Sequence, residues 1–84
     1  MKKITKTILL ADAVFRYFDE VVGGISSEFA YYELVEETDK YMRNGNQTEF
    51  ISYLDCIFGI SKKDFIKITK NYNLKVKEMK EYLD

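Results

Sequence analysis

The 84-residue sequence contains no histidine, no proline, no tryptophan and one cysteine, and these absences narrow what the chain can do. Without histidine, it lacks the commonest general base and the commonest protein ligand for zinc. Without proline, helices can run through any part of the chain with no ring clash and no missing N–H donor. The lone Cys56 cannot form a disulfide within the chain, which is typical of a protein from a reducing compartment.

Long apolar runs are also missing. Residues 8–11 form the longest run near the start, and Asp12 interrupts it far short of the ~20 residues that a membrane span needs. Arg16 and Asp19 interrupt the segment where the apolar part of a secretory signal would continue, so we expect neither a membrane contact nor secretion. Lysine outnumbers arginine eleven to two, a bias associated with AT-rich bacterial and phage genomes. We therefore expect a cytoplasmic protein, located in the host cell cytoplasm if a phage encodes it.

The remaining composition is that of a small folded domain. Hydrophobic residues make up 46% of the chain and aromatic residues 15%, which is enough for a packed core. The length leaves no room for a second core, so residues 1–84 are expected to form a single helical domain. Helix signals recur along the chain and no stretch alternates as a strand does. We predict an all-α fold, a bundle of four to five short helices that can contain a helix-turn-helix-like corner.

Apolar residues at steps of three and four predict a first helix over residues 4–22. Ile8 and Val22 lie on its main apolar face, and other apolar side chains widen that face until a narrow polar stripe is left. Such a helix is expected to have neighbours on two sides and to lie at the centre of the bundle. Gly23 and Gly24 should end it, because glycine adopts the left-handed conformation without a Cβ penalty.

A second helix is expected from a serine cap at Ser26 or Ser27 to Arg43. Its predicted inward residues are Tyr31, Leu34, Val35, Thr38, Tyr41 and Met42. Because adjacent helical residues lie about 100° apart, Tyr31 and Tyr32 cannot both point inward.

The next two helices begin at sequences with capping-box spacing, residues 46–49 and residues 61–64, and Gly59 separates them. The predicted inward residues of the third helix are Phe50, Leu54, Ile57 and Phe58, with Cys56 as a small core residue beside them. Those of the fourth helix are Phe65, Ile68 and Tyr72.

Asparagines predict a break after the fourth helix, at Asn71 and Asn73. A fifth, lysine-rich helix is then expected over residues 74–83. Its predicted packing residues are Val76, Met79 and Leu83.

Residues 50–72 attract functional interest because they combine a helix, a sharp turn and a lysine-bearing helix. Over residues 51–70 the stretch resembles the helix-turn-helix pattern of bacterial DNA-binding proteins, with apolar residues at set offsets around Gly59. The resemblance implies a recognition helix that faces DNA phosphates. Its residues would be Ser61 as the cap, with Lys62, Lys63, Lys67 and Lys70 on the exposed side.

The stretch departs from that pattern at two positions. Asp55 stands where the close helix crossing normally has a small residue, and the apolar Ile66 stands where a side chain would face the bases. Little base-specific hydrogen bonding is then available. An ordinary packing corner between two helices would need the same glycine, cap and apolar spacing, and it is the alternative interpretation.

Charge is segregated along the chain. Residues 17–39 contain seven acids and no lysine or arginine, whereas residues 61–84 contain seven lysines and four acids. The second helix carries both acids and surface aromatic residues, which indicates a surface for a protein partner or a second copy of the chain. The candidate residues are Phe29, Tyr32, Glu33, Glu36 and Glu37. Two solvated helix faces and half-buried tyrosine rings would give the same pattern.

No sequence pattern indicates catalysis. Cys56 has no histidine to activate it, and the chain has no glycine-rich phosphate loop and no calcium loop. We expect a non-enzymatic protein with no cofactor, no metal and no small-molecule substrate. The first interpretation is a small bacterial or phage-type regulator or inhibitor that binds another protein. The alternatives are a DNA-binding regulator that uses residues 62–70 and a self-associating structural protein of a mobile element, a homo-oligomer.

Overall fold

A computed structural model describes residues 5–23 and 28–82, with the side chains of Glu28 and Tyr82 left out. The described residues form helices and no strand, which confirms the all-α prediction. The four α-helices are α1 (Lys6–Tyr17), α2 (Glu28–Asn44), α3 (Gln47–Phe58) and α4 (Lys62–Glu78). A π-helical turn, η1 (Phe18–Val22), extends α1, and a 3₁₀ turn, η2 (Lys80–Tyr82), follows α4.

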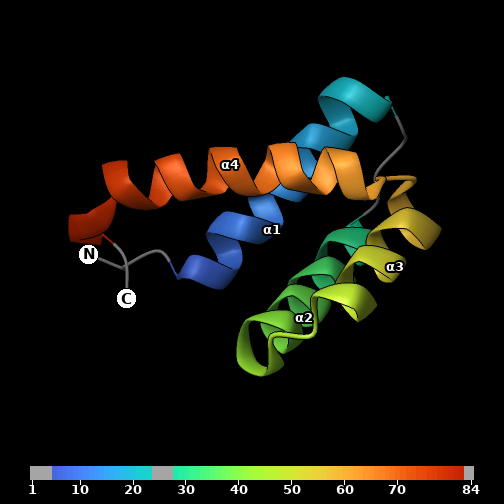
Figure 1. The fold of residues 1–84 in the computed structure, drawn as a ribbon, viewed down its shortest axis with the longest axis horizontal. Coiled ribbons are helices and arrows are strands. Elements are labelled where there is room, and N and C mark those ends of the chain that lie inside the picture. The colour runs from blue at the N-terminus through green and yellow to red at the C-terminus, as the bar shows by residue number, and fades with distance from the viewer. Residues whose placement is uncertain (1–4, 24–27, 83–84) are drawn as a thin grey trace.

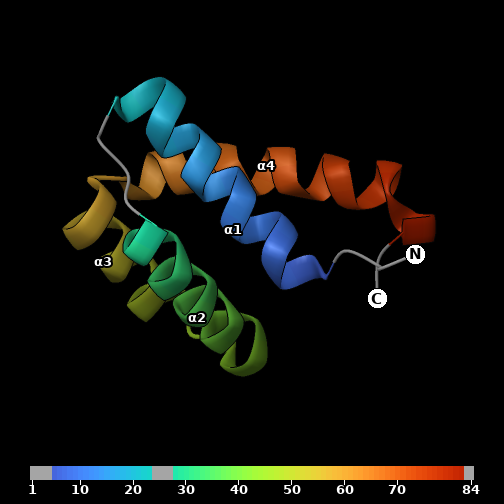
Figure 2. The same cartoon turned by 180° about the vertical axis from the view of Figure 1, so that it is seen from behind.

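The first helix lies at the centre, as its wide apolar face predicts. It contacts α2 along one side and α4 along another, and α3 lies beside α2 (Figures 1 and 2). Leu10, Ala11 and Val14 of α1 are each at most 1% exposed, because both neighbours cover them. The buried apolar core consists of Leu10, Ala11, Val14, Phe18, Leu34, Phe50, Leu54, Phe58, Ile60, Phe65 and Ile68.

The end of the first helix differs from the prediction. The chain passes from α-helix into a π turn at Phe18, and the Gly23 N–H donates to the Phe18 carbonyl at 2.9 Å. A π turn adds a residue to the hydrogen-bonded ring, which rotates later side chains off the α-helical face. Val21 and Val22 are therefore exposed, and the expectation that Val22 is buried was wrong. Gly23 has φ of 76° and ends the helix as expected, whereas Ile4 and Gly24 lie outside the described residues.

The second helix follows its predicted inward face with one exception. Leu34 and Thr38 are buried, and the Thr38 hydroxyl donates to the Leu34 carbonyl at 2.6 Å. Met42, which was expected to point inward, is 37% exposed, because the adjacent Tyr41 takes the inward position and packs on Phe50. The predicted caps at Ser26 and Ser27 lie outside the described residues.

The third helix buries a narrower stripe than predicted. Phe50, Leu54 and Phe58 repeat at every fourth position and are buried, whereas Ile57 is 49% exposed. Cys56 is also exposed, so its assignment to the core was wrong. α2 and α4 both pack on this helix, and the stripe of Phe50, Leu54 and Phe58 is the part that they bury.

The fourth helix is continuous through Asn71 and Asn73 to Glu78, so the predicted break and the separate fifth helix were wrong. Asparagine lowers helix propensity by at most about 0.7 kcal/mol per residue, and it does not block the backbone hydrogen bonds. The buried Ile68 and the half-buried Tyr72 and Val76 anchor the helix against the rest of the structure on both sides of the asparagines.

Burial on α3 leads to a paired stability test. Leu54→Ala should lower the free energy of unfolding by about 2–5 kcal/mol, because it leaves a cavity in the core. Ile57→Ala, three residues away on the exposed side, should change it by no more than about 0.5 kcal/mol. Urea denaturation of both variants measures the difference, and similar losses for the two variants would contradict the burial pattern.

Candidate functional site

The N-terminal half of α2 presents two aromatic side chains and several acids to solvent. Phe29 is 87% exposed and Tyr32 is 59% exposed, one helical turn apart. Glu33 and Glu36 are also exposed and continue the same face at steps of three and four residues. These four residues, Phe29, Tyr32, Glu33 and Glu36, are named the α2 surface below. The structure thus brings together four of the five residues predicted for protein binding.

The adjacent Tyr31 is half-buried and Tyr32 is exposed, which confirms the prediction that the two tyrosines do not both point inward. The ring of Tyr31 meets Phe15 edge-on with the centroids 5.3 Å apart, and its hydroxyl donates to Asp12 Oδ1 at 2.7 Å. Burial and the hydrogen bond to Asp12 raise the pKa of Tyr31 to about 12. Tyr31 therefore fixes α2 on α1, whereas Tyr32 beside it is exposed.

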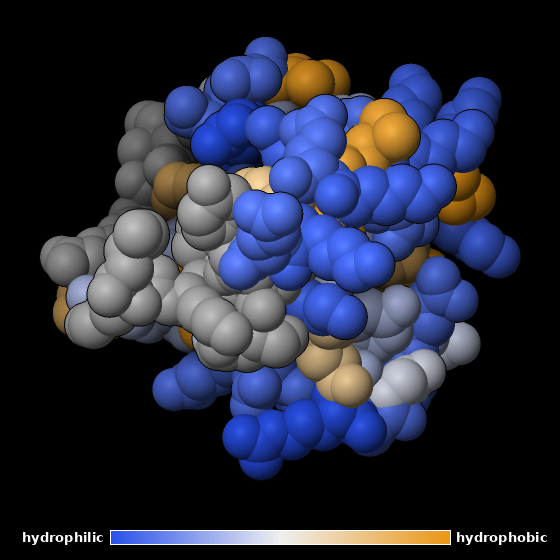
Figure 3. All heavy atoms as spheres, turned by 90° about the vertical axis from the view of Figure 1, so that its left-hand side faces the viewer, coloured by the Kyte–Doolittle hydropathy of each residue, from blue (hydrophilic) through white to orange (hydrophobic). Residues whose placement is uncertain are grey.

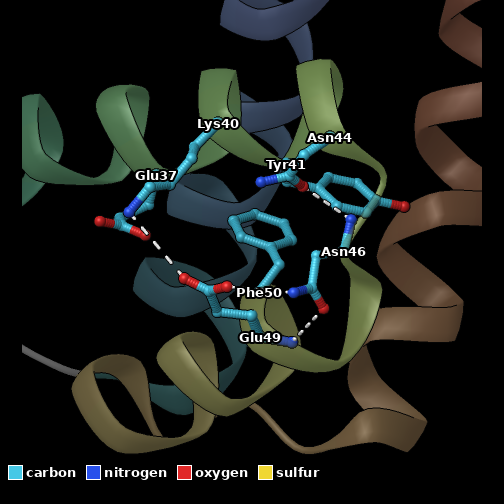
Figure 4. A pocket seen from close by; sticks show the side chains of 7 residues that line it. All are labelled: Glu37, Lys40, Tyr41, Asn44, Asn46, Glu49 and Phe50. Atoms are coloured by element: carbon cyan, nitrogen blue, oxygen red, sulfur yellow. Dashed lines mark hydrogen bonds and ion pairs between the residues drawn. The ribbon is translucent and has the colours of Figure 1, made fainter.

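Glu37, the fifth predicted residue, turns away from the α2 surface toward α3. It lines a hollow of about 10 Å³ at the α2–α3 junction, where Lys40 and Glu49 form an ion pair at 3.9 Å (Figure 4). The rings of Tyr41 and Phe50 stack there, 4.8 Å between centroids. A hollow of this size holds at most about one water molecule. This junction is a packing contact, and it offers no room for a ligand.

Tyr53 of α3 approaches the acids of α2 from below the surface. Burial, and then the negative charge of Glu33, raises the pKa of the Tyr53 hydroxyl. Its hydroxyl oxygen is buried and has no hydrogen-bond partner of good geometry within the described part of the chain. Tyr53 therefore stays protonated at neutral pH, with its hydroxyl close to the carboxylate of Glu33.

The corner between α3 and α4 takes three residues, as the sequence predicted. Gly59 has φ of 65°, and Ile60 after it is fully buried and pins the corner to the core. Ser61 caps α4 through a capping box with Asp64: the Asp64 N–H donates to Ser61 Oγ at 3.2 Å, and the Ser61 N–H donates to Asp64 Oδ2 at 3.3 Å. The Ser61 hydroxyl also donates to Asp64 Oδ2 at 2.9 Å, so it is already hydrogen-bonded within the fold.

Asp64 also ties this corner to the first helix. The Tyr17 hydroxyl donates to Asp64 Oδ1 at 2.6 Å. This bond, with those from Ser61, lowers the pKa of Asp64 below its usual range. One carboxylate therefore fixes the start of α4 and its docking on the end of α1.

The lysines predicted to face nucleic acid lie on the exposed side of α4. Lys62, Lys63, Lys67 and Lys70 are all exposed, and so is Lys77 further along the helix. Lys63, Lys67, Lys70 and Lys77 share one face at helical spacing and are named the α4 lysine stripe below. The ion pairs within the described ranges involve none of these four lysines.

The structure also contains a groove that the sequence did not predict. It lies between α1 and α4, has a volume of about 460 Å³, and is lined by Leu9 and Ala13 on one side and by Ile68, Tyr72 and Leu74 on the other. The charged residues around it are Arg16, Glu20, Lys75 and Glu78. No local pattern could locate this groove, because it depends on how α4 crosses α1. Its size suits a small ligand, but its mixed charges define no ligand class.

Other site types find no support in the described residues. Residues 5–23 and 28–82 hold no cluster of three metal-ligating side chains. None of the described helices combines the length and apolar composition needed to cross a bilayer. Seen toward the end of α4, the surface is mainly hydrophilic, with apolar side chains in separate patches (Figure 3).

Comparison of the chain with protein-family models, with curated proteins and with solved structures found no match. Proposals about its function therefore rest on its own residues.

The Asp64 contacts predict an acid-dependent stability difference. Because the folded state lowers the pKa of Asp64 from 3.8, its contribution is fully present above pH 3.8 and is lost as the pH falls through the folded value. Asp64→Asn should therefore melt below the wild type at neutral pH, and the two melting temperatures should converge in acid. Thermal unfolding between about pH 2 and pH 7 measures this. A gap that does not change with pH would show that the charge of Asp64 plays no part.

Proposed function

We propose that the chain is a small non-enzymatic module that binds another protein through the α2 surface. The observation that carries the proposal is the 87% exposure of Phe29, one turn from the exposed Tyr32. Covering a side chain of this size on binding is worth about 1.5–3 kcal/mol. Aromatic residues are enriched at protein interfaces because they supply large contact areas at a low cost in entropy.

The acids on the α2 surface select the chemistry of the partner. Glu33 and Glu36 lie beside the aromatic side chains and carry the same charge, so a basic partner surface is favoured. Charge complementarity of this kind speeds association and disfavours acidic partners. A module that occupies a basic surface of its partner would act as a regulator or inhibitor. A bacterial or phage origin and a cytoplasmic location belong to the same proposal.

A basic amphipathic probe tests the α2 surface. We expect a fluorescein-labelled helical peptide of leucine and lysine to bind with micromolar affinity in an anisotropy titration. The double variant Phe29→Ala/Tyr32→Ala should weaken binding at least about tenfold, which corresponds to about 1.4 kcal/mol. Ile57→Ala removes an exposed apolar side chain of α3 and serves as the control, with binding unchanged. Equal affinity of all three proteins would overturn the proposal.

DNA binding is the second candidate function, and the α3–α4 corner favours it. A three-residue turn with the buried Ile60 leads directly into a helix that exposes the α4 lysine stripe. Lysines on one helix face can replace the counterions of a phosphate backbone. The exposed Ile66 on this helix adds no hydrogen bond to base edges, so the expected binding is not sequence-specific.

Fluorescence anisotropy of a labelled random DNA duplex tests whether the chain binds DNA. If the lysine stripe binds DNA, affinity at low salt should fall steeply toward physiological salt. Lys63→Glu/Lys67→Glu should weaken it further, whereas Glu33→Lys on α2 should not. Absence of binding at low salt would exclude the candidate, because attraction to phosphate appears there first.

A further inference from the structure

The α2 surface and the α4 lysine stripe have complementary properties. The first presents the carboxylates of Glu33 and Glu36, and the second presents four lysines at helical spacing. Exposed apolar side chains accompany both. Phe29 and Tyr32 lie on α2, while Ile66 lies on α4 and is 47% exposed. The two faces therefore have opposite charges, and each also exposes apolar surface that a contact could bury.

The two faces cannot meet within one copy. Leu34 of α2 and Phe65 of α4 point into the common core, and the α2 surface and the α4 lysine stripe lie on the opposite, exposed sides of their helices. A contact between the faces must therefore join two copies. A contact between one α2 surface and one α4 lysine stripe is heterologous. It leaves the pair with one free face of each kind, the α4 lysine stripe of one copy and the α2 surface of the other.

We propose that the α2 surface of one copy binds the α4 lysine stripe of a second copy, so that the chain assembles head to tail. This rests on the α2 surface proposed above as a protein-binding surface, and it names a second copy of the chain as the partner. The glutamates pair with lysines of the stripe, and the aromatic side chains cover Ile66. Repetition of the contact gives rings if the rotation closes and open filaments if it does not.

Charge reversal on each face tests the assembly. The acid variant is Glu33→Lys/Glu36→Lys, and the lysine variant is Lys67→Glu/Lys70→Glu. We expect the sedimentation mass of the wild type to rise with concentration to at least about twice the monomer mass and to fall with added salt. Each variant alone should remain monomeric, because it carries two faces of the same sign.

Mixing the two variants tests whether opposite charges on the two faces hold the copies together. Equimolar acid and lysine variants should associate again, because each then meets faces of the opposite sign. Glu20→Lys/Asp55→Lys changes the net charge as the acid variant does, at exposed positions outside both faces, and should assemble like the wild type. Circular dichroism of every variant checks that the helices remain folded.

The outcomes separate this proposal from the preceding one. A wild type that stays monomeric at low salt and high concentration overturns head-to-tail assembly. Assembly that persists in both variants overturns it too, because the contact then lies elsewhere. If the wild type is monomeric but the acid variant no longer binds the leucine–lysine peptide, head-to-tail assembly fails and the α2 surface still binds a basic partner. If the wild type neither assembles nor binds the leucine–lysine peptide, both proposals fail.

Discussion

The structure depends on covering the first helix from two sides. Leu10, Ala11 and Val14 are almost completely buried, and both α2 and α4 must pack on α1 to achieve this. Burying an aliphatic side chain of this kind is worth about 1.5–3 kcal/mol, so separation of either neighbour would be costly. Because α2 and α4 pack on α1, their inner faces are buried in the core. Their outer faces are left to solvent, and these outer faces are the ones available for interaction.

Tyrosine hydroxyls fix how the two neighbours sit on the central helix. The Tyr31 hydroxyl of α2 donates to Asp12 of α1, and the Tyr17 hydroxyl of α1 donates to Asp64 of α4. Apolar packing is non-directional, whereas a hydrogen bond to a carboxylate prefers one separation and one angle. In a chain without histidine and with two arginines, tyrosine supplies this orienting contact. The raised pKa of Tyr31, about 12, keeps its hydroxyl a donor at neutral pH.

Local signals in the sequence predicted the corner between α3 and α4, but not the end of α4 or how much of each helix is covered. Gly59 and the capping box at Ser61 act within a few residues, so spacing alone reveals them. The exposure of Val22, Ile57 and Cys56 depends on how many neighbours a helix has, which periodicity does not report. The α2 surface was predicted because its residues are close in sequence. The groove between α1 and α4 joins residues about sixty positions apart and left no local signal.

Like charges on the exposed faces of α2 and α4 reduce the stability of these helices. Glu33 and Glu36 are three residues apart on the exposed face of α2, and Lys63 and Lys67 are four residues apart on α4. Like charges at these spacings destabilise a helix by about 0.2–0.5 kcal/mol per pair. Favourable pairing is available to the same chain, as the Asp39–Arg43 ion pair at 2.9 Å demonstrates. Folding alone therefore does not favour one sign of charge on each outer face. A contact with an oppositely charged surface would offset this cost, which supports the proposal that both faces serve recognition.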